Sequence, residues 1–152
     1  MLNYYIDLSE RILVKAKMEE DSTSLRKELF YIRISSLESK IKTDELKKNF
    51  WVNIYNAYLL IMVNEQIQNK KIFKLKRIKF SQCRLSLNDI EYGILRKQKY
   101  KIGFYKIYNP FYPSFIKKLA IEKLDNTITR CLDKSILYKT SEVKKMDFDY
   151  FS

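Results

Sequence analysis

The hydrophobic pattern of the chain is dominated by one long run in its first half. Residues 49–63 contain no charge, no glycine and no proline, and apolar side chains fall on every face of a helix drawn through them. A helix of this kind is typically covered on most sides. Thr43 precedes the run as a candidate cap, and Asp44 and Glu45 suit the positive end of a helix. We therefore predict a buried central helix over about 44–68.

Polar side chains form one strip on this helix. At about 100° per residue, Asn49, Asn53 and Asn56 share a face. A buried amide that lacks a hydrogen-bond partner costs roughly 1–3 kcal/mol, so we expect Asn53 and Asn56 to bond to protein groups. The apolar side chains between them are expected in the core: Trp51, Ile54 and Tyr55.

The rest of the chain carries weaker periodic signals. Helical spacing of apolar residues predicts amphipathic segments near residues 3–18, 25–34, 35–41, 115–123 and 128–136. Ser22, Thr23 and Ser24 are candidate caps for the second of them. Residues 78–82 resemble a short strand that turns at 81–84, which predicts a small hairpin ending at residue 85.

A second informative stretch follows this hairpin. Ser86 lies three residues before Asp89, the spacing of a capping box, and this predicts a helix over 87–96. Gly93 inside the helix costs about 1 kcal/mol relative to alanine. We therefore expect another part of the chain to approach closely at Gly93.

The composition narrows the fold class. With 152 residues and an apolar share of 46%, the chain suits one domain with a modest core. Two glycines and two prolines are too few for the many tight turns of a sandwich or barrel. We predict an α+β fold that is mostly helical, with helices around the buried central helix and a small antiparallel sheet.

The net charge of +12 favours acidic partners such as nucleic acid or anionic lipid. One cluster is the candidate nucleic-acid contact: Lys70, Lys71, Lys74, Lys76, Arg77 and Lys79. The aromatic and basic segment 100–112 is either a second contact, whose rings stack on bases, or a loop held to the core by those rings. A lysine-rich, solvated surface is the alternative interpretation of the charge.

Several reaction classes lack their usual residues. The chain has no histidine, the commonest general base and metal ligand. Cys83 and Cys131 form no CxxC pair and are expected to be free thiols of a reducing compartment. No metal or other cofactor is indicated. No secretory signal is visible, and the apolar run 50–63 is shorter than the roughly 20 residues of a membrane span, so we expect a cytoplasmic protein.

Two motifs in this order, W-x-N-x-Y-N-A at residues 51–57 and S-L-x-D-I-E-x-G-I-L-R at residues 86–96, resemble those of the family catalogued as domain of unknown function 547. A following segment with F-P and K-L-D has a counterpart in Tyr112-Pro113 and residues 123–125. The likeness covers roughly residues 3–125 and implies a shared fold. It marks five structural motif positions: Trp51, Tyr55, Ser86, Gly93 and Arg96.

The chain departs from that family in two places. Tyr92 stands where members usually have histidine. After residue 125, members continue with a strand of the type R-I-H-F-A-L-N-C-G and a second cysteine motif, which residues 126–152 do not match. We therefore carry over no catalytic residue. We expect one domain over 1–125 and a divergent, truncated or frameshifted tail over 126–152, which would leave part of the central helix uncovered.

Three interpretations of function stay open. In the first, the chain is a non-enzymatic member of the family, and Asn53 and Asn56 bridge to Asp89 or Glu91 in a buried polar network. In the second, the same four residues are the remnant of a hydrolase-like pocket, with the carboxylates as acid and base. In the third, the chain is a basic nucleic-acid-binding module.

Overall fold

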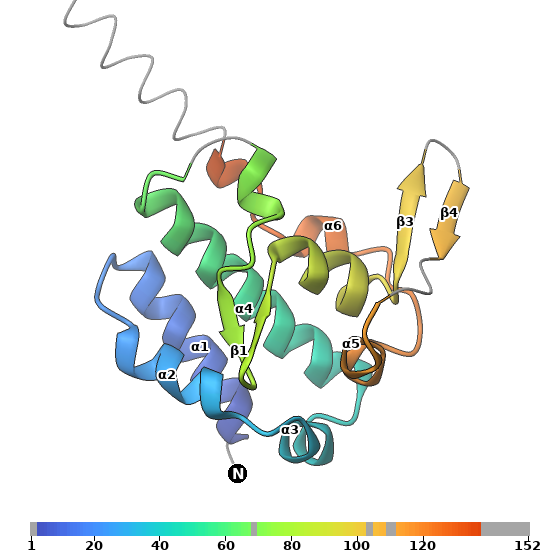
Figure 1. Cartoon of the computed structure of the whole chain (residues 1–152), viewed down its shortest axis with the longest axis horizontal. Coiled ribbons are helices and arrows are strands. Elements are labelled where there is room, and N and C mark those ends of the chain that lie inside the picture. The colour runs from blue at the N-terminus through green and yellow to red at the C-terminus, as the bar shows by residue number, and fades with distance from the viewer. Residues whose placement is uncertain (1–2, 68–69, 103–104, 109–111, 138–152) are drawn as a thin grey trace, which may run out of the picture.

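Helices make up most of the molecule, and two short hairpins complete it (Figure 1). The computed structural model describes residues 3–67, 70–102, 105–108 and 112–137. Its elements are, in order, α1 (Tyr4–Lys17), α2 (Thr23–Tyr31), α3 (Ile34–Lys40), α4 (Asp44–Asn64), η1 (Lys70–Phe73), β1 (Ile78–Phe80), β2 (Cys83–Leu85), η2 (Asp89–Leu95), β3 (Lys99–Ile102), β4 (Tyr105–Tyr108), α5 (Ser114–Leu119) and α6 (Ile128–Cys131). Strands β1 and β2 pair with each other, as do β3 and β4, both antiparallel. The predicted mostly helical α+β fold is confirmed.

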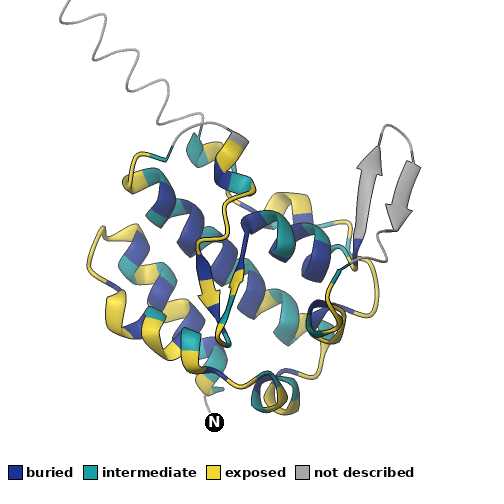
Figure 2. Cartoon of the chain, viewed as in Figure 1, coloured by how far each residue is buried: buried dark blue, intermediate teal, exposed yellow. Residues whose placement is uncertain are grey.

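Helix α4 is the centre of the core, as the apolar run predicts. The Thr43 hydroxyl caps it by accepting a hydrogen bond from Leu46 N at 3.2 Å. Figure 2 shows buried residues along most of its length, and they are Phe50, Trp51, Ile54, Tyr55, Ala57, Tyr58, Leu59 and Met62. The helix ends at Asn64, four residues before the predicted end, because the backbone turns at Gln66, whose φ is +62°.

The N-terminal helices cover one side of α4. Helix α1 lies along it, and α2 packs beside α1 (Figure 1). The Asn3 side chain caps α1 by accepting hydrogen bonds from the backbone N–H groups of Tyr5 and Ile6. At α2 the capping group is Asp21, which accepts from Thr23 N at 3.0 Å, and not one of the hydroxyls that the sequence offered.

The predicted hairpin is present as β1–β2, and its turn is docked on α2. Ser81 and Gln82 form the two-residue turn with φ values of +47° and +60°, a conformation that usually favours Asn-Gly. Their backbone N–H groups donate to the carbonyl oxygens of Leu29, at 3.3 Å, and Phe30, at 2.9 Å. The Leu29 carbonyl, which also accepts from Ile32 N at 3.4 Å, and the Phe30 carbonyl thus hold the hairpin tip against the end of α2.

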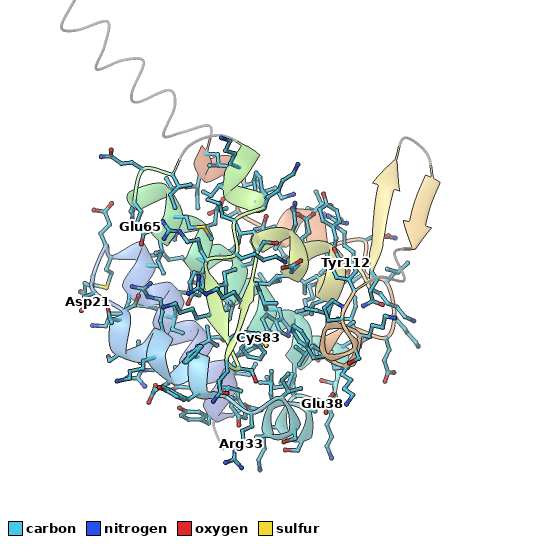
Figure 3. The ribbon with its side chains drawn as sticks, viewed as in Figure 1. Asp21, Arg33, Glu38, Glu65, Cys83 and Tyr112 are labelled. Atoms are coloured by element: carbon cyan, nitrogen blue, oxygen red, sulfur yellow. The ribbon has the colours of Figure 1, made fainter. Side chains whose placement is uncertain are left out.

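The second motif forms a wider helix than predicted. Residues 87–88 are α-helical, and η2 continues them as a π-helix. The longer register is visible where Arg96 N donates to Glu91 O, five residues earlier, at 2.8 Å. The predicted close approach at Gly93 is confirmed, because a Cβ there would lie 2.8 Å from Ile116 Cγ2 and 3.1 Å from Tyr112 Cε1. Tyr112 is labelled beside η2 in Figure 3.

The last third of the described chain differs most from the sequence prediction. Strands β3 and β4 form a hairpin where a loop was predicted over 100–112, and residues 103–104 and 109–111 lie outside the described residues. Helix α5 ends at Leu119, before the predicted 123. The single helix predicted over 128–136 is wrong, because the backbone leaves α6 in an extended conformation at Leu132.

Segment 120–134 is fastened to α4 by polar side chains. Lys47 Nζ donates to Ala120 O at 3.0 Å, and Lys48 Nζ lies 2.7 Å from Asp125 Oδ2 and 2.6 Å from Thr127 Oγ1. The hydrogen bond from Lys48, followed by those from Thr127, holds the pKa of Asp125 well below its usual range. Ile128 and Leu132 are buried, and no large apolar side chain of α4 is exposed within the described residues. The prediction that part of the central helix would be left exposed is therefore wrong.

Candidate functional site

The two asparagines of the first motif bind protein groups, as predicted, but not the predicted partners. Asn53 Nδ2 donates to Ser9 Oγ of α1 at 3.1 Å and to Asn49 Oδ1 at 3.2 Å. Asn56 Nδ2 donates to Cys131 O at 3.0 Å, and Asn56 Oδ1 accepts from Asp133 N at 2.9 Å. Asn56 thus binds the last residue of α6 with one end of its amide and the backbone just after α6 with the other. The predicted bridge from these amides to Asp89 or Glu91 is therefore wrong.

Asp89 is committed to the start of its own helix. Its Oδ2 accepts a hydrogen bond from Ser86 N at 2.8 Å, and Asp89 N donates to Ser86 Oγ at 3.1 Å. This is the capping box that the spacing predicts. Lys76 forms an ion pair with the same carboxylate oxygen. Within the described residues, no hydrogen bond joins Asp89 to Asn53 or Asn56.

Glu91 is the centre of a buried ionic cluster. Only 2% of its side chain is exposed, and its two oxygens are held by different cations. Arg96 Nε donates a hydrogen bond to Oε2 at 3.0 Å, and Lys134 Nζ lies 2.6 Å from Oε1 in an ion pair that lacks hydrogen-bond geometry. Arg96 also donates to Thr129 Oγ1 at 3.0 Å. The π-helical register places Glu91 and Arg96 one turn apart, and Lys134 arrives from the segment that Asn56 binds.

Tyr55 of α4 lies next to this cluster. Its ring is fully buried, and its hydroxyl has no hydrogen-bond partner within the described residues. Burial, and then the nearby Glu91 carboxylate, raise the pKa of the Tyr55 hydroxyl well above its usual value. The hydroxyl therefore stays protonated.

The other motif positions build the scaffold. The Trp51 ring packs edge-to-face on Phe50 and Phe80, with centroid distances of 4.9 and 5.0 Å, and joins α4 to β1. Gly93 lets α5 approach η2, and Ser86 starts that helix. Trp51, Ser86 and Gly93 thus have structural roles, in the packing between elements or in the start of a helix.

A groove lies on another part of the molecule, between α2 and the β1–β2 hairpin. It has a volume of about 710 Å³, within the usual range of ligand sites. Helix α2 forms one wall, the hairpin and the residues before it form the other, and α4 lies at the base. Six cationic side chains line it, Arg26, Lys27, Lys76, Arg77, Lys79 and Arg84, against one carboxylate, Glu65. Glu65 is labelled at the end of α4 in Figure 3. We call it the basic groove.

Only two of these six cations have an acidic partner in the described part of the chain, and three make no side-chain contact of this kind at all. Lys76 is paired with Asp89, Arg77 lies 3.7 Å from Glu65, and Arg26 Nε donates to Ser22 Oγ. No ion pair or side-chain hydrogen bond within the described residues involves the remaining three: Lys27, Lys79 and Arg84. All three are exposed, so the groove presents uncompensated positive charge to solvent.

The hairpin holds two of these cations face to face. In the β1–β2 register, Lys79 is directly opposite Arg84. Both are exposed, while Ile78, Phe80 and Leu85 are buried. Like charges directly opposite in an antiparallel pair are destabilising. A local arrangement that costs stability without an evident structural return is typical of functional positions.

The predicted basic cluster contributes only part of this groove. Lys76, Arg77 and Lys79 line it, whereas Lys71 and Lys74 do not, and the side chain of Lys70 is outside the described residues. The rings that line it are not those of segment 100–112 but Phe30, Tyr31 and Tyr58. The α2 wall was missed, although its residues follow helical spacing i, i+3, i+4, i+7, i+8: Thr23, Arg26, Lys27, Phe30 and Tyr31.

Comparison with known families agrees with the motifs. The model of the family described as protein of unknown function, DUF547, matches residues 39–141, which is more than half of the chain. The chain belongs to the DUF547 family. No curated protein and no solved structure matches it. The DUF547 match starts after residue 3 and continues beyond 125, across the first part of the predicted tail. The division of the chain at 125, and the shifted reading frame, stay predictions.

Two further observations concern metals and membranes. Within the described ranges, no three or more Cys, Asp or Glu side chains are grouped so that they could hold a metal ion. No helix in the same ranges has both the length and the apolar character needed to cross a bilayer.

Proposed function

We propose that this DUF547 domain is a non-catalytic binding module whose basic groove receives a phosphate-rich polyanion. The observation that carries the proposal is the charge of the groove, six cations against one carboxylate, with Lys27, Lys79 and Arg84 unpaired. Concentrated charge of one sign in a cleft attracts and retains ligands of the opposite sign. The docked hairpin turn supports it further, because a fixed hairpin keeps both walls of the groove in place.

The contacts of the motif residues favour the non-catalytic half of this proposal. A general acid or base has to reach the reacting proton. Glu91 is buried and ion-paired, and Asp89 caps its helix. The hydrolase-like alternative needs both carboxylates beside Asn53 and Asn56, which bind α1 and the segment after α6 instead. We expect that hydrolysis of generic ester or peptide substrates is no faster with the purified chain than with its Cys131→Ser variant.

The groove is tested by isothermal titration calorimetry with inorganic polyphosphate. Lys79→Glu combined with Arg84→Glu should weaken binding at least tenfold and reduce its salt dependence, since fewer phosphates are neutralised. The matched control is Lys117→Glu combined with Lys118→Glu, two exposed lysines of α5 outside the groove with the same change in net charge. Equal losses in both variants, or no binding by the unmodified chain, would contradict the proposal.

A further inference from the structure

Tyr31 is an exposed aromatic ring in the basic groove. It is the last residue of α2 and is 60% exposed, whereas Tyr58 at the base of the groove is 3% exposed. Its ring packs edge-to-face on Phe30, with centroids 5.1 Å apart and an interplanar angle of 75°. This contact holds the ring at the groove while most of its surface stays open to solvent.

The ring and the unpaired cations share the same face of the molecule. Lys27 is one helical turn before Tyr31 on α2, so the two side chains are neighbours on one helix face. Lys79 and Arg84 stand on the opposite wall, on the outward face of the hairpin. Glu65 lies at the α4 end of the groove and carries the only acidic side chain among its lining residues.

We infer that the polyanion is a single-stranded nucleic acid, with phosphates on Lys27, Lys79 and Arg84 and one base stacked on Tyr31. This inference rests on the proposed function above and names the ligand class of the same groove. Proteins that bind single strands combine a basic groove along the backbone with aromatic side chains on which bases stack. In a duplex the base faces are covered by their neighbours, so an isolated exposed ring finds no free base to stack on.

The charges of the groove set the expected path of the strand. Phosphates are attracted to the α2 and hairpin walls and repelled by Glu65, whose nearest cation, Arg77, is 3.7 Å away. The strand should therefore run along the two walls, over Lys27, Lys79 and Arg84, and away from Glu65. An acidic protein segment would use the same cations but would offer no base for Tyr31.

The test uses the full 152-residue chain and four probes of matched negative charge. The probes are a fluorescently labelled 12-nucleotide oligothymidylate, a DNA duplex, inorganic polyphosphate and poly-glutamate; the last three are measured as competitors. We expect the oligothymidylate to bind most tightly. With three or four phosphates neutralised, its affinity should fall about twenty- to fiftyfold between 50 and 200 mM salt.

The decisive variant is Tyr31→Ala. It should weaken oligothymidylate binding about five- to 160-fold, the range for loss of one base–aromatic stack, and leave polyphosphate binding unchanged. Tyr4→Ala is the matched control, because Tyr4 is 53% exposed on α1 and does not line the groove. Both tyrosines are exposed, so circular dichroism should show unchanged folding in each variant.

The outcomes separate this inference from the proposed function. The single-strand inference is overturned if polyphosphate binds but Tyr31→Ala leaves oligothymidylate affinity unchanged. It is also overturned if duplex DNA or poly-glutamate binds more tightly than the oligothymidylate. In both cases the proposed binding of a polyanion or acidic partner stands. If none of the four probes binds, both fail. Selective loss of oligothymidylate binding in Tyr31→Ala, with Tyr4→Ala unaffected, supports the inference.

Discussion

Around Glu91 one buried carboxylate is matched by two cations, whereas along the basic groove six cations face a single carboxylate. The first group is closed. Arg96 is hydrogen-bonded and Lys134 is ion-paired to Glu91, and the cluster joins η2 to the segment after α6. The second group is open, and Lys27, Lys79 and Arg84 have no acidic partner within the described chain.

This difference indicates which charged residues stabilise the fold and which are available to bind a ligand. A buried charge needs its partner, and removal of that partner is costly, so the Glu91 cluster serves the fold. Exposed charges of one sign contribute little to the fold and are available to a ligand. Glu91 and Arg96 belong to the second motif, whereas Lys79 and Arg84 belong to neither. The motifs that reveal kinship therefore describe the scaffold, and the groove has to be found in three dimensions.

The largest expected effect is on the scaffold itself. Trp51→Ala should lower the free energy of unfolding by about 3–5 kcal/mol, because it removes a ring that is 1% exposed and packed on Phe50 and Phe80. Thermal denaturation should show a midpoint lower by roughly 6–20 °C. Val14→Ala, at an exposed site on α1, is the control. An unchanged midpoint in Trp51→Ala would mean that α4 is not the centre of the core.

Glu91→Gln distinguishes the two groups of charges most clearly. It leaves Arg96 and Lys134 without a counter-charge and should cost about 1.5–3 kcal/mol, the range for hydrogen bonds to charged groups. The lower end is expected, because the two cationic side chains are 27% and 39% exposed. Polyphosphate affinity should stay unchanged.

The opposite result is expected for Lys79→Glu combined with Arg84→Glu. Its free energy of unfolding should stay within about 0.5 kcal/mol of the unmodified chain, as for most surface changes, while polyphosphate affinity falls. If Glu91→Gln lost affinity without losing stability, the contrast between a structural cluster and a binding groove would be wrong.

Asn56→Ala probes the link between α4 and the segment after α6. It removes the hydrogen bonds to Cys131 O and Asp133 N, at a cost of about 1–3 kcal/mol. Hydrogen exchange of the backbone amides over 128–134 should become faster. Asn53→Ala, which affects the contact with α1, should leave that segment protected. Unchanged exchange in Asn56→Ala would show that the segment is held by other contacts.

The smallest effect is expected from Tyr55→Phe. The hydroxyl it removes is buried and has no partner within the described residues, so the variant should be as stable as the unmodified chain, or more stable by up to about 1 kcal/mol. Chemical denaturation measures this difference, with Tyr58→Phe for comparison. A clear loss of stability would indicate that a bound water or another group satisfies the Tyr55 hydroxyl.

The sequence predicted local features correctly, but it did not predict hydrogen-bond partners that are far apart along the chain. The capping box of Ser86 and Asp89 spans three residues, and the continuous apolar run fixed the burial of Trp51, so both were predictable. The partners of Asn56 are 75 and 77 residues away, at Cys131 and Asp133. No periodicity carries that information, and the pairing with Asp89 or Glu91 was accordingly wrong.

The sequence did not predict the basic groove for a related reason. Its two walls, α2 and the β1–β2 hairpin, meet because the N–H groups of Ser81 and Gln82 donate to the end of α2. Neither residue is glycine, so the turn conformation itself had no signature. The cations of the hairpin were visible as a cluster, but Tyr31 and Lys27 joined them only through this docking.

The most direct measurement of where this domain binds its ligand is a titration of the ¹⁵N-labelled chain with inorganic polyphosphate, followed in ¹H–¹⁵N correlation spectra. We predict that the largest shifts occur at the backbone amides of Lys27, Lys79 and Arg84, while those of Glu91 and Lys134 stay in place. Largest shifts at Glu91 and Lys134, or equal shifts at lysines over the whole surface, would contradict the assignment of binding to the basic groove.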